Sequence, residues 1–164
     1  MKRITKEEIE RAEQLVAAKK SRDLTGYIKK YPQVSDYLAH RASSLEDEPL
    51  ISHILFFPLF LCGLSEELGL ETKNAGNEAI SLNDEYYETL IEEKTVNDEI
   101  IHRDILDEIN LMHPQPDMVE YIFHKTLDYE SDKMDFDDCL VLLQTALTIF
   151  DSIIGLERQK NKKN

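Results

Sequence analysis

Two pairs of glutamate and histidine residues have the spacing that helical metal sites use. One pair is Glu99 and His102, three residues apart, and the other is Glu120 and His124, four residues apart. On a helix, the two members of each pair would lie on adjacent turns. If the two segments form an antiparallel hairpin around Pro114, both histidines would lie within about one turn of each other. Two imidazoles and two carboxylates could then bind a metal ion, as in a helical-bundle metalloprotein or a metal-dependent hydrolase.

Two features of the sequence favour ordinary surface or boundary histidines instead. A di-iron carboxylate bundle needs two Glu-x-x-His motifs and two further glutamates, whereas this chain has one such motif with an imperfect second pair. On a helical wheel, His102 and His124 fall at the flanks of apolar stripes and not at their centres. The metal site is therefore the alternative prediction, and no cofactor is expected.

Acidic residues also recur at helical spacing in the middle of the chain. They are Glu85, Glu88 and Glu92, followed by Asp104, Asp107 and Glu108. Residues 84–138 hold 18 acidic and 4 basic side chains. The net charge of this segment is therefore -14, the same as that of all 164 residues. Such a field repels nucleic-acid phosphates and attracts basic surfaces. We therefore expect no direct nucleic-acid binding, and we interpret the six residues as a docking face for a protein partner with a basic surface. The alternative is a solvated acidic face that keeps the protein soluble.

Signatures of common catalytic sites are absent from the sequence. There is no nucleophile elbow, P-loop, dinucleotide-binding fingerprint or zinc-protease motif, and the chain has five glycines. Cys62 and Cys139 lie in apolar stretches without CxxC spacing, which is typical of buried structural cysteines. The sequence therefore favours a non-catalytic binding or regulatory protein over an enzyme.

Helical periodicity predicts the elements that would position these residues. Thr5 to Glu8 has the form of a capping box, with Ile4 and Ile9 placed as a hydrophobic staple. Helices are predicted at about 6–20, 24–30, 32–44, 49–68, 83–94, 98–112, 116–129 and 136–159, and the longest loop at 70–82. We therefore expect an all-α compact bundle of six to eight helices.

Two apolar helices are expected at the centre of that bundle. The helix over 49–68 is apolar on all sides and contains Pro58, which should kink or break it. The long helix over 136–159 has two apolar stripes beside a narrow polar strip. The strip consists of Asp137, Gln144, Thr148 and Asp151. Because two stripes need two sets of neighbours, this helix could also form a homodimer contact.

A single domain over residues 1–157 is expected, with residues 158–164 as a frayed basic tail. The longest apolar run covers eleven residues, 54–64, whereas a membrane span needs about 20. The charged N-terminus lacks the apolar segment of a secretory signal. These features predict a cytoplasmic protein with no membrane segment.

Overall fold

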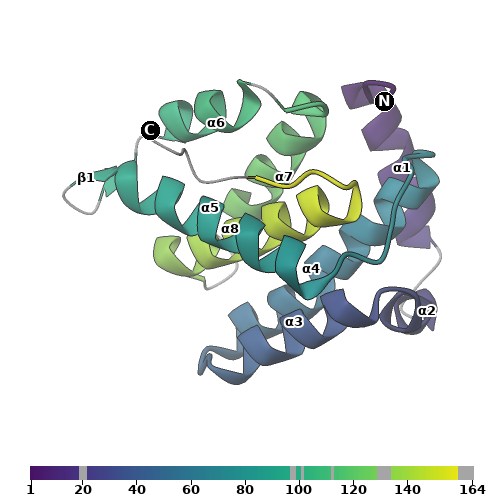
Figure 1. Cartoon of the computed structure of the whole chain (residues 1–164), viewed down its shortest axis with the longest axis horizontal. Coiled ribbons are helices and arrows are strands. Elements are labelled where there is room, and N and C mark those ends of the chain that lie inside the picture. The colour runs from purple at the N-terminus through teal and green to yellow at the C-terminus, as the bar shows by residue number, and fades with distance from the viewer. Residues whose placement is uncertain (19–21, 97–98, 101, 112, 129–133, 159–164) are drawn as a thin grey trace.

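The computed structural model describes residues 1–18, 22–96, 99–100, 102–111, 113–128 and 134–158, and within them it is all-helical (Figure 1). The eight helices of the described residues are α1 Lys6–Ala18, α2 Arg22–Lys30, α3 Pro32–Ser43, α4 Glu48–Glu67, α5 Asn77–Glu93, α6 His102–Asn110, α7 Pro116–Asp128 and α8 Phe136–Ile153. Two short strands, β1 Thr95–Val96 and β2 Glu99–Ile100, pair antiparallel between α5 and α6. The predicted all-α bundle of six to eight helices is confirmed.

Helices α4 and α8 form the centre of the bundle. They pack against each other, and α1, α2 and α3 contact α4 while α5 and α7 contact α8. Helix α6 packs on α7 at the periphery. Figure 1 shows α2 and α3 on one side of this pair and α6 on the opposite side.

Helix α4 is an apolar core helix that runs without a break through Pro58. It ends just before Gly69, whose φ of 75° is the left-handed conformation that glycine adopts after a helix. Among the described helices, α4 is the one long and apolar enough to span a membrane, but 56% of that stretch is buried by other parts of the protein. Such burial is typical of the central helix of a soluble protein.

Helix α8 is shorter than predicted and almost fully covered. It ends at Ile153, and Gly155 with a φ of 81° then turns the chain, whereas the prediction extended the helix to Gln159. Every residue from 142 to 154 is buried within the monomer, because α4, α5 and α7 surround this stretch. The surplus apolar surface that suggested a homodimer contact is therefore absent from this part of α8.

The predicted loop over 70–82 is also too long. Helix α5 begins at Asn77 with Gly76 as its N-cap residue, so its first six residues occupy part of that segment. The predicted helix begins at residue 83, whereas in the structure Asn83 is buried within α5. Its amide nitrogen lies 2.9 Å from the Ser152 hydroxyl and 2.9 Å from the Leu156 carbonyl oxygen, and it donates to both.

The N-terminal start signals were predicted correctly. The Glu8 amide donates to the Thr5 hydroxyl at 3.2 Å, and the Thr5 amide donates to the Glu8 carboxylate at 3.3 Å. Ile4 and Ile9 are each 1% exposed, as a hydrophobic staple requires. The Ile4 amide also donates to the Gln115 side chain at 2.8 Å, which ties the N-terminus to the turn before α7.

Candidate functional site

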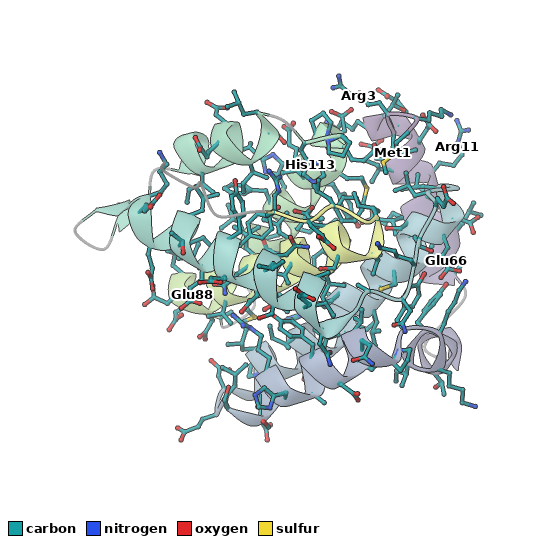
Figure 2. All side chains as sticks on the ribbon, in the orientation of Figure 1. Met1, Arg3, Arg11, Glu66, Glu88 and His113 are labelled. Carbon is teal, nitrogen blue, oxygen red and sulfur yellow. The ribbon has the colours of Figure 1, made fainter. Side chains whose placement is uncertain are left out.

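The outer side of α5 carries a row of exposed glutamates. Glu85, Glu88 and Glu92 are exposed, and the helical repeat places them opposite the buried residues Asn83 and Tyr87. Glu88 is labelled beside α5 in Figure 2. Within the described part of the chain, no ion pair neutralises Glu88 or Glu92. We call Glu85, Glu88 and Glu92 the acidic row.

The second group of predicted docking residues belongs to α6. Asp107 and Glu108 are exposed, and the side chain of Asp104 lies outside the described residues. Burial raises the pKa of the Tyr86 phenol on α5, and the negative charge of Glu108 adds to this rise. Glu108 therefore lies near enough to the Tyr86 side chain of α5 to act on it electrostatically.

The first Glu/His pair does not share a helix. Glu99 lies in β2, and His102 is the first residue of α6, whereas the prediction put both on one helix. The side chains of both residues lie outside the described part of the structure. Among the side chains that are described, no group of three or more histidine, cysteine, aspartate or glutamate residues is arranged to hold a metal ion.

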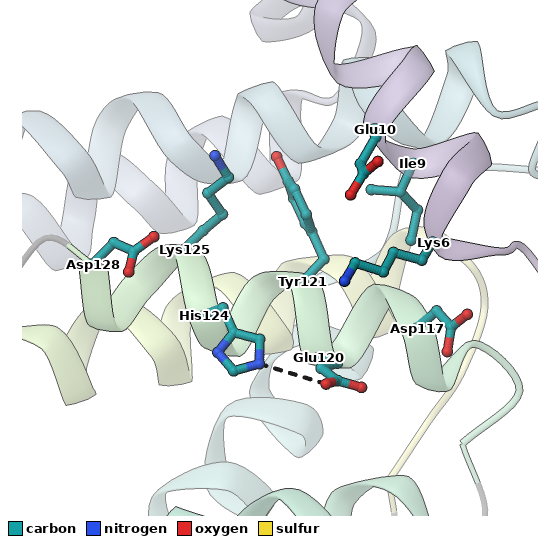
Figure 3. Close-up of a pocket in the computed structure, with 9 residues that line it drawn as sticks. All are labelled: Lys6, Ile9, Glu10, Asp117, Glu120, Tyr121, His124, Lys125 and Asp128. Carbon is teal, nitrogen blue, oxygen red and sulfur yellow. Dashed lines mark ion pairs between the residues drawn. The ribbon is translucent and has the colours of Figure 1, made fainter.

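The second Glu/His pair lies on the surface of α7. His124 Nε2 is 3.5 Å from Glu120 Oε1, and the two side chains are 64% and 54% exposed. They line an open groove of about 350 Å³ between α1 and α7, beside Lys6 and Tyr121 (Figure 3). So exposed an ion pair contributes at most about 1 kcal/mol to stability. The geometry is that of an ordinary surface pair on one helix, and no third ligand joins it among the described side chains.

The polar strip of α8 turns inward over most of its length. Thr148 and Asp151 are fully buried and Gln144 is 9% exposed, while Asp137 is exposed. Buried polar groups need partners, because an unpaired one costs about 1 to 3 kcal/mol. The partners of Asp151 come from three other parts of the chain.

Asp151 is the centre of a buried polar cluster. Its Oδ1 atom lies 2.7 Å from His113 Nε2, and its Oδ2 atom accepts from Arg158 Nε at 3.2 Å and from the Tyr87 hydroxyl. His113 Nδ1 accepts the backbone N–H of Gln115 at 2.9 Å, so Nε2 carries the ring hydrogen and donates it to Asp151. Because both ring nitrogens are occupied, His113 has none left to move a proton on a substrate. The pair links α8 to the turn before α7.

Arg158 closes the cluster on its outer side. Its guanidinium carbon lies 5.0 Å from the ring centre of Tyr86 and 5.8 Å from that of Tyr87, within the range of cation–π contacts. A terminal nitrogen donates to the Ile109 carbonyl at 3.3 Å, and the backbone N–H donates to the Asn83 side chain at 2.6 Å. Arg158 is thus docked on the domain, although the sequence assigned it to a frayed tail. Residues 159–164 lie outside the described residues.

Sequence reasoning missed this cluster because its members are distant in the chain. Tyr87 and Asp151 are 64 residues apart, and Asn83 and Arg158 are 75 apart. The one local signal was the Asp151 carboxylate, which lies next to Phe150 and Ile149 near the end of a largely apolar helix. An aspartate in that position is rarely fully buried without partners, which could have prompted a search for them.

The chain matches no protein-family model, no curated protein and no solved structure. Three features of the structure bear on function: the Asp151 cluster, the groove between α1 and α7, and the acidic row. The Asp151 cluster is internal and its polar atoms are engaged with one another. The groove between α1 and α7 holds an exposed ion pair. The acidic row on α5 exposes three carboxylates of like charge along one side of a helix.

Proposed function

We propose that the protein is a non-catalytic acidic binding protein that docks onto the basic surface of a protein partner. The acidic row of α5 makes the contact, and the exposed carboxylates of Asp107 and Glu108 on α6 add to the negative charge. The observation that carries this proposal is the exposure of Glu85, Glu88 and Glu92 on the solvent side of one helix. A rigid helix presents the three carboxylates at fixed spacing, so a partner need not order them on binding.

The charge of the whole chain supports this proposal. The net charge is -14, and residues 84–138 supply an equal charge by themselves. A field of this kind speeds the approach of a cationic surface and lowers the rate of encounter with anionic ones. A basic protein surface therefore fits better than nucleic acid.

The chemistry of the interior supports a non-catalytic role in the cytoplasm. Burial raises the pKa of the Cys62 thiol well above its ordinary value, which makes it a poor nucleophile. Neither Cys62 nor Cys139 forms a disulfide and both are buried, as is usual for proteins of a reducing compartment. His113, the one buried histidine among the described residues, uses both ring nitrogens within the fold.

The experiment compares two variants that change the net charge equally. The test variant is Glu85→Lys, Glu88→Lys and Glu92→Lys, and the matched control is Glu10→Lys, Glu67→Lys and Glu71→Lys, at exposed positions elsewhere on the molecule. The partner is isolated from the host on immobilised wild-type protein and then purified. Its Kd is measured for all three proteins at about 30 mM and about 300 mM salt.

We expect the test variant to weaken binding by about tenfold or more at low salt, and by less at high salt, because rim charges act mainly through screened long-range attraction. The control should weaken it much less, since its charges lie away from α5. Equal losses in both variants, or a loss that ignores salt, would show that the acidic row is not the docking surface.

A further inference from the structure

The pocket that holds Arg158 has the composition of a guanidinium-binding site. Its floor is the carboxylate of Asp151, which is 0% exposed, and its walls are the rings of Tyr86 and Tyr87. The carbonyl oxygen of Ile109 accepts from a second nitrogen of the same guanidinium. A buried anion, two aromatic faces and a separate backbone acceptor match the planar fork of donors that an arginine carries.

Burial distinguishes this pocket from the surface ion pairs of the molecule. The ion pair between Lys30 and Glu66, for example, has side chains 57% and 27% exposed, whereas those of Arg158 and Asp151 are 12% and 0% exposed. Water screens the first pair and is almost absent from the second, so the attraction in the pocket is much stronger. Although burial opposes it, Tyr87 and Asp151 raise the pKa of Arg158, so the pocket holds a charged guanidinium.

We propose that this pocket is an arginine-binding site which Arg158 occupies within the same chain, and that an arginine side chain of the basic partner takes its place when the Arg158 side chain swings outward. This inference rests on the proposed function, because it supplies a specific contact for the basic surface. Glu93 and Glu108 both act on the Tyr86 phenol electrostatically, so they lie near the pocket and would attract an incoming cation.

Exchange at this pocket makes Arg158 an internal competitor of the partner. A tethered side chain has an effective concentration in the millimolar range, so a free arginine would displace it poorly. A partner that is already held at the acidic row would present its arginine at a comparable effective concentration. The hydrogen bonds between Asn83 and the backbone at residues 156 and 158 can persist during this exchange, because only the side chain has to move.

The first test is chemical rescue with ethylguanidinium, which has the charge and shape of the end of an arginine side chain. Arg158→Ala should lower the melting temperature, and about 10 mM ethylguanidinium should raise that of the variant by about 2 to 4 °C through binding to the emptied pocket. Wild-type protein should respond much less, and ethylammonium should be a weaker rescuer because it lacks the fork of donors.

Two further variants serve as controls. Asp151→Asn combined with Arg158→Ala should not respond to ethylguanidinium, since the buried anion is gone. Arg41→Ala should respond less, because Asp84 in that site is 23% exposed. The rise in melting temperature could be equal in wild type or in the double variant, or equal when ethylammonium replaces ethylguanidinium. Any of these results would show a general salt effect and refute the arginine-binding site. If Arg158→Ala does not fold, Arg158→Gln gives the same comparison, because its shorter, uncharged side chain leaves the Asp151 carboxylate without a cation.

The second test is the Kd of Arg158→Ala for the partner isolated above. Removal of the internal competitor should tighten binding by about fivefold or more. Unchanged or weaker binding by a folded Arg158→Ala variant would overturn the exchange, even if ethylguanidinium fills the pocket. Failure of the acidic-row variant to affect binding would instead refute the proposed function, whatever the rescue experiment shows.

Discussion

Carboxylates occupy two opposite environments in this molecule. Glu85, Glu88 and Glu92 are exposed on the outer side of α5, whereas Asp151 is fully buried on α8 with His113, Tyr87 and Arg158 around it. An exposed charge contributes about 0 to 1 kcal/mol to stability and remains accessible to another molecule. A buried charge must keep its partners, because losing one leaves the other unpaired away from water. The outer carboxylates are therefore placed to attract a partner. The inner one supports the fold and, in the exchange proposed above, is the anion with which either arginine pairs.

Asp84 provides an intermediate case on the same helix as the acidic row. Its carboxylate accepts from the Tyr37 hydroxyl at 2.8 Å, from Arg41 at 3.2 Å and from Gln144 at 3.0 Å, and it is 23% exposed. The cluster resembles that of Asp151 in chemistry, since it combines an arginine and a tyrosine with a carboxylate. It differs in burial, so it should contribute less to stability.

The largest effect is expected when the buried carboxylate is removed. Asp151→Ala should lower the free energy of unfolding by about 3 to 5 kcal/mol, because it leaves Arg158, Tyr87 and His113 without their common acceptor. Asp84→Ala should cost less, and Asp137→Ala, exposed on the same helix as Asp151, should change stability by at most about 0.5 kcal/mol. Urea unfolding of the three variants gives this ranking. A cost of Asp151→Ala no greater than that of Asp137→Ala would remove the distinction between buried and exposed carboxylates.

The apolar contacts of α8 should be of similar importance. Leu143→Ala and Leu147→Ala should each cost about 2 to 5 kcal/mol, since both side chains are 0% exposed among α4, α5 and α7. Thr148→Ala is the matched control: its buried hydroxyl oxygen has no hydrogen-bond partner within the described residues, so its loss leaves no donor or acceptor unpaired. Calorimetry measures all three. If both leucine variants unfold at the wild-type temperature, α8 is not the core helix.

A smaller, pH-dependent effect is expected at the start of α8. Burial, followed by a hydrogen bond to Asp47 and the charge of Asp135, raises the pKa of Asp138 to about 6. Between about pH 4 and about pH 6 the folded chain therefore holds a proton that the unfolded chain releases, so this group's contribution to stability falls as the pH rises. Asp138→Asn should remove that slope and stabilise the protein at pH 7. Wild type and variant with parallel curves from pH 4 to pH 7 would contradict the shift.

The sequence predicted the parts of the fold that depend on local signals. The capping box at Thr5 marks a helix start through contacts within a few residues, and it was read correctly. Asn83 and Asp151 were misread because important partners lie far away in the chain. The partners of Asn83 are 69 to 75 residues away, and Asp151 is 64 residues from Tyr87 and 38 from His113. A polar residue beside an apolar stripe can face solvent or belong to a buried polar cluster. The sequence does not distinguish the two until the neighbouring helices are known.

Among the candidate site residues, too, those that depend on local periodicity were predicted and the others were not. Exposure of the acidic row followed from helical periodicity, since Glu85, Glu88 and Glu92 fall opposite the apolar positions of α5. The prediction that Glu99 and His102 share one helix was wrong, because β1 and β2 pair where that helix was predicted to begin. Pairing between two-residue strands leaves little trace in a sequence, because alternation over so few positions resembles any other pattern.

Urea unfolding of two isosteric variants tests most directly the central claim that outer and inner carboxylates have different tasks. The variants are Asp151→Asn and the triple variant Glu85→Gln, Glu88→Gln and Glu92→Gln. The triple variant should unfold within about 0.5 kcal/mol of wild type, or require slightly more urea because repulsion between glutamates three and four residues apart is relieved. Asp151→Asn alone should cost about 2 kcal/mol or more, because the charge opposite Arg158 is lost inside the fold. A triple variant as unstable as Asp151→Asn would show that the acidic row supports the fold, and would contradict its assignment to binding.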